Sequence, residues 1–96
     1  MKRFLAYLAL AAMLVSAPAM ASAACFADYK ASKDNPLRLH YGVAQISGAC
    51  STRNAWAQLE ARLAAQGWTL RRVLSVFDER GLDERKRSAG SYYLRY

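Results

Sequence analysis

The side chains in this sequence that could do chemistry are few, and their spacing does not suggest a catalytic set. His40 is the only histidine among the 96 residues, so neither a multi-histidine metal site nor a Ser-His-Asp triad with spare members is available. A lone histidine could act as a general base only with a partner that orients its ring. We therefore expect no enzymatic activity, no metal and no cofactor, and we interpret His40 as a histidine on an open strand face.

Four carboxylates close together in the sequence could suggest an acid–base pair. They alternate with basic residues, however, which is typical of a solvated segment whose charges neutralise one another; the residues are Asp78, Glu79, Asp83 and Glu84, interleaved with Arg80, Arg85, Lys86 and Arg87. No glycine-rich phosphate-binding loop is present in the sequence. Neither pattern indicates an enzyme.

The first 23 residues have the composition of a cleavable signal peptide. A basic start over residues 1–3 precedes an apolar stretch over residues 4–15, and two small-x-small sites then end at Ala21 and Ala23. A retained membrane anchor is the alternative, but Pro18 interrupts the segment and alanine dominates it. We expect a signal peptide over 1–23, one small domain over 24–96, and a periplasmic or secreted protein without a stable membrane anchor.

The two cysteines, Cys25 and Cys50, lie 25 positions apart, unlike a redox-active C-x-x-C pair. In an oxidising compartment two thiols of a small exported domain usually form a disulfide. Such a crosslink would stabilise the fold by about 3 kcal/mol in the chain-entropy model. The alternative is a lipid on Cys25, as in bacterial lipoproteins, although the leucine usually found three residues before such a cysteine is absent.

Hydrophobic periodicity predicts the elements of the domain. Trp56, Leu59 and Leu63 share one face of a helix that Ser51 or Thr52 can cap at its start. We expect Gly67 to end this helix with a positive φ and to fold Trp68 back onto Leu63 in the core. Strands are predicted over 37–46 and 68–77, a weaker strand over 25–31, a charged loop with one helical turn over 78–90, and a terminal strand over 91–96. Strict alternation would place Arg72 on the helix-covered face, so either its side chain extends to the sheet edge or a bulge near 71–72 shifts the register.

This order predicts an α+β fold, a βαββ sandwich of one helix on a three- to four-stranded mixed sheet with one disulfide. The helical crossover should make the strands over 37–46 and 68–77 parallel, with a right-handed connection. The terminal strand should return antiparallel to the latter. One sheet face would then lie under the helix, and the other would have no second layer.

The run from Leu63 to Leu70 (Leu-Ala-Ala-Gln-Gly-Trp-Thr-Leu), with the later Tyr-x-Leu-Arg, resembles a widespread small bacterial βαββ domain of unknown function. Arg71-Arg72 depart from the apolar or small residues of that domain. The chain after the signal also resembles small exported proteins of alphaproteobacteria, through residues 29–31, 35–43, 67–70 and 93–96. The resemblance implies the compartment and the fold, and it brings no catalytic residue.

The predicted alternation also places a basic and aromatic surface on the uncovered sheet face. If Leu37, Leu39 and Tyr41 face the helix, the other face collects five candidate binding residues: Arg38, His40, Arg71, Tyr93 and Arg95. Arginine beside aromatic rings suits carboxylate, phosphate or sugar-rich partners. Without Lys2 and Arg3 the chain keeps 12 basic against 7 acidic side chains, a net charge of +5. A basic surface often indicates nucleic acid, but export argues against it.

We therefore expect a non-catalytic binding or interaction module for an anionic envelope component or an acidic protein. A basic sheet face that is merely solvated is an equally simple interpretation, because net charge alone gives only non-specific attraction. A structural or self-associating domain is a further alternative, with a homodimer formed through Val73, Phe77 and Tyr93. A small enzyme or enzyme inhibitor is the third, and the sequence offers no positive support for it.

The signal-peptide hypothesis predicts the mass of the exported protein. The chain should begin at Ser22 or Ala24 and carry no lipid, because the two small-x-small sites lie directly before these residues. Intact mass spectrometry of the protein recovered from the periplasm checks this. A diacylglyceryl mass on Cys25, or a retained Met1, would contradict it.

Overall fold

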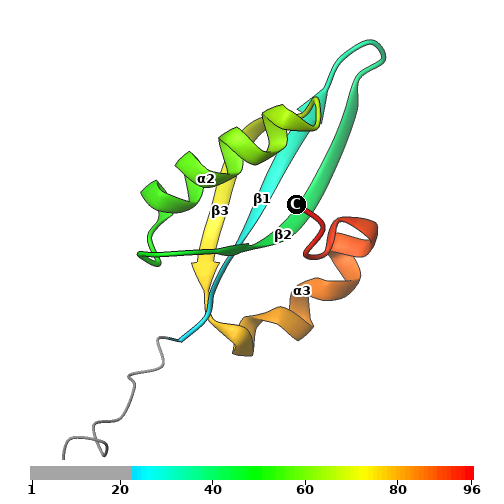
Figure 1. Ribbon diagram of the computed structural model, residues 1–96. Coiled ribbons are helices and arrows are strands. Elements are labelled where there is room, and N and C mark those ends of the chain that lie inside the picture. Colours follow the sequence, from blue (N-terminus) through cyan, green and yellow to red (C-terminus); the bar gives the residue numbers. More distant parts are fainter. Residues whose placement is uncertain (1–22) are drawn as a thin grey trace, which may run out of the picture.

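The computed structural model describes residues 23–96, which form one antiparallel sheet with helices on both of its faces (Figure 1). The strands β1 (Cys25–Lys33), β2 (Arg38–Ile46) and β3 (Thr69–Phe77) lie in the order β2-β1-β3. Helix α2 (Thr52–Ala65) connects β2 to β3, and a short helix α3 (Leu82–Ala89) follows β3. The α+β class is confirmed. Apart from Ala23, the predicted signal peptide lies outside the described residues.

The strand with the weakest sequence signal, β1, is the central one. It pairs antiparallel with both β2 and β3, and residues 25–29 are buried without interruption. A strand covered on both faces needs no alternation of apolar and polar residues, which explains the weak signal. Strands β2 and β3 run in the same direction, as expected, but β1 lies between them. Every pairing between the three strands is therefore antiparallel, and the sheet is not mixed.

The predicted terminal strand over 91–96 is wrong. After α3 the chain forms a 3₁₀ turn over Gly90–Tyr92, and its only bridge to the sheet joins Tyr93 to Val43 of β2. Gly90 and Leu94 both have positive φ, at 56° and 55°, which interrupts an extended backbone. This C-terminal segment crosses the β2 edge, where the Leu94 backbone N–H donates to the Val43 carbonyl at 2.7 Å.

Helix α2 covers one face of the sheet with a stripe of small and branched side chains. Ala55, Leu59 and Leu63 are buried and pack with Tyr29 of β1 and Val73 of β3. Trp56, expected on this stripe, is 38% exposed, and Ala55 takes its place. The smaller residue lets the helix lie close to the sheet.

Both ends of α2 have the caps that the sequence predicts. At the start, the Ser51 hydroxyl accepts from the Asn54 backbone N–H at 3.1 Å. At the end, Gly67 has a φ of 82° and the Trp68 N–H donates to the Leu63 carbonyl at 2.9 Å. Trp68 is thereby turned back into the core, where it is 4% exposed.

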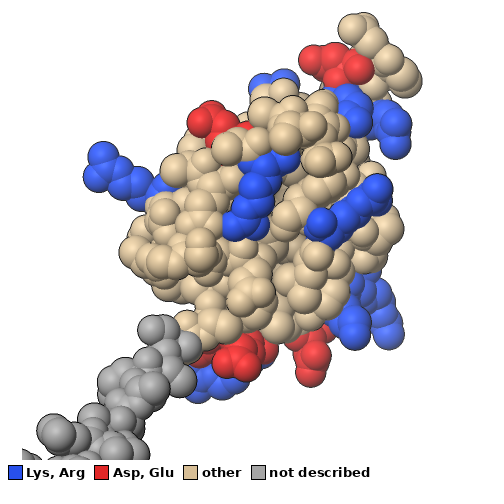
Figure 2. Space-filling model, in the orientation of Figure 1, with Lys and Arg blue, Asp and Glu red and all other residues tan. Residues whose placement is uncertain are grey.

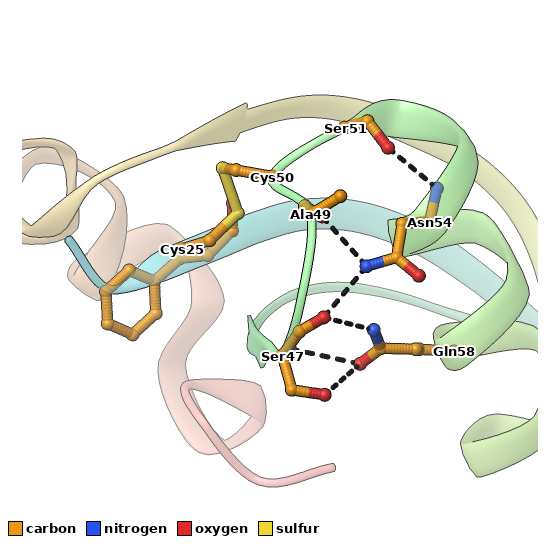
Figure 3. The surroundings of a disulfide bond; sticks show 8 residues. Cys25, Ser47, Ala49, Cys50, Ser51, Asn54 and Gln58 are labelled. Atoms are coloured by element: carbon orange, nitrogen blue, oxygen red, sulfur yellow. Dashed lines mark hydrogen bonds between the residues drawn. A yellow bond between two sulfur atoms is a disulfide. The ribbon is translucent and has the colours of Figure 1, made fainter. Parts of the chain in front are cut away.

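A Cys25–Cys50 disulfide joins the first residue of β1 to the loop before α2 (Figure 3). The same loop is held by two side-chain amides of α2. Asn54 donates to the carbonyls of Ser47 and Ala49, both at 2.8 Å, and Gln58 also donates to the Ser47 carbonyl. The disulfide confirms the predicted pairing, and a Cys25 in this bond has no free thiol to carry a lipid.

The positive φ of Gly67 predicts a backbone cost for any β-carbon at this position. Gly67→Ala should lower the free energy of unfolding by about 1 kcal/mol, because a Cβ is strained in the left-handed region. The nearest side-chain atom, Lys33 Cε, would lie 3.5 Å from that Cβ, an ordinary contact, so the cost is conformational. Gly67→Asn should cost less, because asparagine tolerates this region. Urea denaturation of the three proteins checks this; equal midpoints would contradict the cap assignment.

Candidate anion-binding site

The structure divides the five predicted binding residues between the two sheet faces. Arg38 and His40 of β2 and Arg95 of the C-terminal segment gather on the α2 side, where His40 and Arg95 share contacts with Tyr92 and Tyr96. Arg71 and Tyr93 lie on the opposite side, apart from this group. The expectation that all five share one open face is therefore wrong.

The face assignment of β2 fails because of the packing around Tyr29. His40, Gly42 and Ala44 face α2, and a Cβ on Gly42 would lie only 2.6 Å from Tyr29 Cζ. The Tyr29 ring of the central strand fills the space beside Gly42, so this position of the edge strand has no room for a larger residue. Leu39 consequently points to the other face and is 72% exposed.

His40 is a core residue and not an accessible base. It is 7% exposed, its Nε2 lies 3.0 Å from the Tyr29 hydroxyl, and its ring stacks on Tyr92 with centroids 3.8 Å apart. Burial lowers the pKa of His40 to about 4, and the nearby charges of Arg95 and Lys33 act in the same direction. At neutral pH the ring is uncharged and enclosed.

The cations on the α2 side lie over aromatic rings. The Lys33 ammonium is 4.6 Å from the Trp68 ring centroid and the Arg38 guanidinium is 5.9 Å from it. Arg95 is 5.4 Å from the rings of both Tyr92 and Tyr96. At such exposed sites each contact stabilises the fold by about 0.5–1 kcal/mol. These cations therefore have a structural role in covering the aromatic cluster.

On the other sheet face, a buried carboxylate holds α3 in place. Asp28 of β1 is 6% exposed and accepts hydrogen bonds from Ser75 at 2.6 Å and Tyr41 at 2.8 Å. The Arg85 guanidinium of α3 donates to the same carboxylate at 3.1 Å. Burial alone would raise the pKa of Asp28, but these three hydrogen bonds outweigh it and lower the pKa below its usual range.

Helix α3 covers only the half of this face at the end of the sheet where β3 ends (Figure 1). Phe26, Val43 and Ala89 form a small apolar cluster there, against which Phe77 and Tyr93 pack. The predicted uncovered face is thus half covered. Because Phe77 and Tyr93 are used within the chain, and Val73 is buried on the α2 side, the three residues do not form a common surface for a homodimer.

The remaining half of this face carries a basic cluster of Lys30, Arg71 and Arg72. Lys30 pairs with Arg72 across the strands and Ala31 pairs with Leu70, which leaves Arg71 as the extra residue of a β-bulge. The bulge, one of the two alternatives that the sequence left open, is confirmed. Directly paired residues point to the same face, and Arg71 joins them there because its Nε donates to Ser32 Oγ at 2.7 Å.

Within residues 23–96, no carboxylate forms an ion pair with the basic cluster. All three side chains belong to exposed residues, and the ion pairs among residues 23–96 are Arg80–Asp78, Arg85–Asp28 and Arg85–Glu84. Like charges directly opposite each other in a sheet are destabilising. Ser32 is 2% exposed and binds only the Nε of Arg71, so the two terminal nitrogens of this guanidinium have no hydrogen-bond partner in the described part of the chain.

A shallow hollow of about 350 Å³ adjoins the basic cluster. Its lining is mostly apolar and consists of Lys30, Ala31, Leu39, His40, Tyr41 and Arg71. Burial and the hydrogen bond to Asp28 raise the pKa of the Tyr41 hydroxyl to about 12, so this ring stays uncharged. The hollow offers cationic groups beside apolar surface, which suits an anion attached to an apolar group.

Sequence reasoning found one member of this cluster, Arg71, and missed Lys30 and Arg72. Lys30 lies beside β3 because β1 is the central strand, and the sequence pattern does not indicate that position. A signal was present in the unusual Arg71-Arg72 pair and in the register conflict at Arg72.

Among residues 23–96, no group of three or more His, Cys, Asp and Glu side chains could hold a metal ion. No helix in the same range is long and apolar enough to cross a membrane. Comparison with protein-family models, with curated proteins and with solved structures finds no match to this chain.

The buried, neutral His40 predicts a specific pH dependence of stability. In the unfolded chain His40 should bind a proton near pH 6.5, whereas the folded state resists protonation until about pH 4. The contribution of the neutral ring to the free energy of unfolding is therefore fully present above pH 6.5. The free energy of unfolding should fall by up to about 3 kcal/mol as the pH decreases to 4. Denaturation by urea across this range checks the prediction. His40→Gln, which does not titrate, should lose most of this pH dependence; an unchanged dependence would contradict it.

Proposed function

We propose that this chain is a small, exported, non-catalytic binding module that holds an anionic partner on its basic cluster. The observation that carries the proposal is the juxtaposition of Lys30, Arg71 and Arg72, which form no ion pair with an acidic residue in the described part of the chain. A bound anion would remove the repulsion between these charges, and the free energy gained in this way would add to its affinity.

The geometry of Arg71 supports a directed contact. Its Nε is fixed by a buried hydroxyl, so the guanidinium loses little freedom when its two terminal nitrogens bind a carboxylate or a phosphate. Arginine forms paired hydrogen bonds with such groups, whereas lysine acts as a point charge beside them. The cluster therefore has one positioned donor and two adaptable charges.

An anionic envelope component or an acidic protein fits this site. The signal-like start of the sequence and the disulfide both support a place outside the cytoplasm, where such partners occur. A catalytic role has less support, because the only histidine is enclosed in the core.

Short-chain polyphosphate is a suitable soluble probe for this proposal. The Kd measured by calorimetry at low salt should rise about tenfold in Arg71→Gln/Arg72→Gln, because two charge-assisted contacts are lost. The control, Arg53→Gln/Arg87→Gln, removes the same charge from exposed residues outside the basic cluster and should change the Kd less than about twofold. An equal effect of the two variants would reduce the proposal to non-specific attraction by net charge.

A further inference from the structure

The hairpin between β1 and β2 projects beyond the body of the molecule and ends in a turn over residues 34–37 (Figure 1). Two leucines on this hairpin are the most exposed large apolar residues of the described chain. Leu37 in the turn is 66% exposed and Leu39 at the start of β2 is 72% exposed. Single exposed leucines are common, but a pair on one projecting tip indicates a contact surface.

Basic residues surround this tip. Lys33 and Arg38 form the last cross-strand pair before the turn, and Leu39 is paired with Ser32, the residue that holds Arg71. Leu39 therefore lies on the face of the basic cluster and lines the same hollow as Lys30 and Arg71. Asp34 is the only acidic residue of the turn, and the other acidic residue of the hairpin, Asp28, is buried and paired with Arg85.

The acidic residues lie mainly at the opposite end of the sheet. Asp78, Glu79, Asp83 and Glu84 all fall in or beside α3, which follows the far end of β3. Figure 2 shows that, on the side where α2 lies in front of the sheet, acidic atoms occur only at the margins. The hairpin end therefore carries basic and apolar residues, whereas the carboxylates of the α3 end alternate with four cations that balance them.

We propose that the hairpin end binds the surface of an anionic lipid bilayer. In this arrangement Leu37 and Leu39 enter the interfacial region, and the basic cluster binds lipid phosphate groups. The inference rests on the proposed function, because it identifies the anionic partner of the same site. Binding of this kind needs buried apolar area together with electrostatic attraction to anionic lipids, and this end of the molecule supplies both.

A bilayer fits this end of the molecule better than an acidic protein does. The leucines lie on a convex projection, which can enter a fluid interface, whereas a protein partner would need a matching concave surface. The hollow continues from Leu39 to the ring of Tyr41, and an aromatic ring with a polar end is suited to the lipid headgroup region. A phosphate at Arg71 would then have its attached apolar group beside these two side chains.

Co-sedimentation with vesicles tests the inference. The full mature protein should bind phosphatidylcholine vesicles that contain phosphatidylglycerol, and binding to pure phosphatidylcholine should be at least tenfold weaker. Leu37→Ser/Leu39→Ser should weaken binding to the anionic vesicles about tenfold. The matched control, Leu74→Ser/Leu94→Ser, changes two other exposed leucines and should bind as the wild type does.

The vesicle and polyphosphate measurements separate this inference from the proposed function. Arg71→Gln/Arg72→Gln should lose affinity for both probes. If the wild type binds polyphosphate through the basic cluster but does not bind anionic vesicles, the membrane inference is wrong and an acidic protein becomes the favoured partner. Equal vesicle binding by the wild type and Leu37→Ser/Leu39→Ser would likewise overturn it. A wild-type protein that binds neither probe would overturn both proposals. Circular dichroism melting confirms that each variant is folded.

Discussion

The buried carboxylate of Asp28 determines how the second face of the sheet is divided. It lies in the middle of the central strand, where an unpaired charge would be very costly, and its bonds to Tyr41, Ser75 and Arg85 offset that cost. These bonds connect all three strands and attach α3. Arg85 is the residue through which α3 reaches Asp28. Beyond it, the basic cluster and the hollow remain open to solvent.

The cations of this small domain have different surroundings on the two faces of the sheet. On the α2 side, Lys33, Arg38 and Arg95 lie against the rings of an aromatic cluster whose histidine is neutral. On the α3 side, Arg85 is paired with Asp28, whereas the basic cluster has neither aromatic rings nor carboxylates as partners. The basic cluster is a group of neighbouring cations that form no ion pair within residues 23–96, which is why the proposed function is placed there and not at the residues first expected.

The sequence predicted those features that depend on local chemistry. The helix with its Ser51 cap, the positive φ of Gly67, the burial of Trp68 and the Cys25–Cys50 bond all follow from short-range signals. Strand order and face assignment depend on long-range packing, which leaves little trace in one sequence. Burial of β1 on both faces removed its alternation, and Gly42 leaves space for Tyr29 from the neighbouring strand. His40 was consequently assigned to the wrong face, and Lys30 was missed.

The disulfide and the proposed binding surface lie at opposite ends of the central strand. Cys25, at the first residue of β1, ties the strand to the loop before α2, whereas Lys30 and the hairpin belong to its other end. A small domain with a limited core has little stability to lose, and like charges opposite each other lower it further. A crosslink acts mainly on the unfolded chain, so it can offset that cost without contacting the charges.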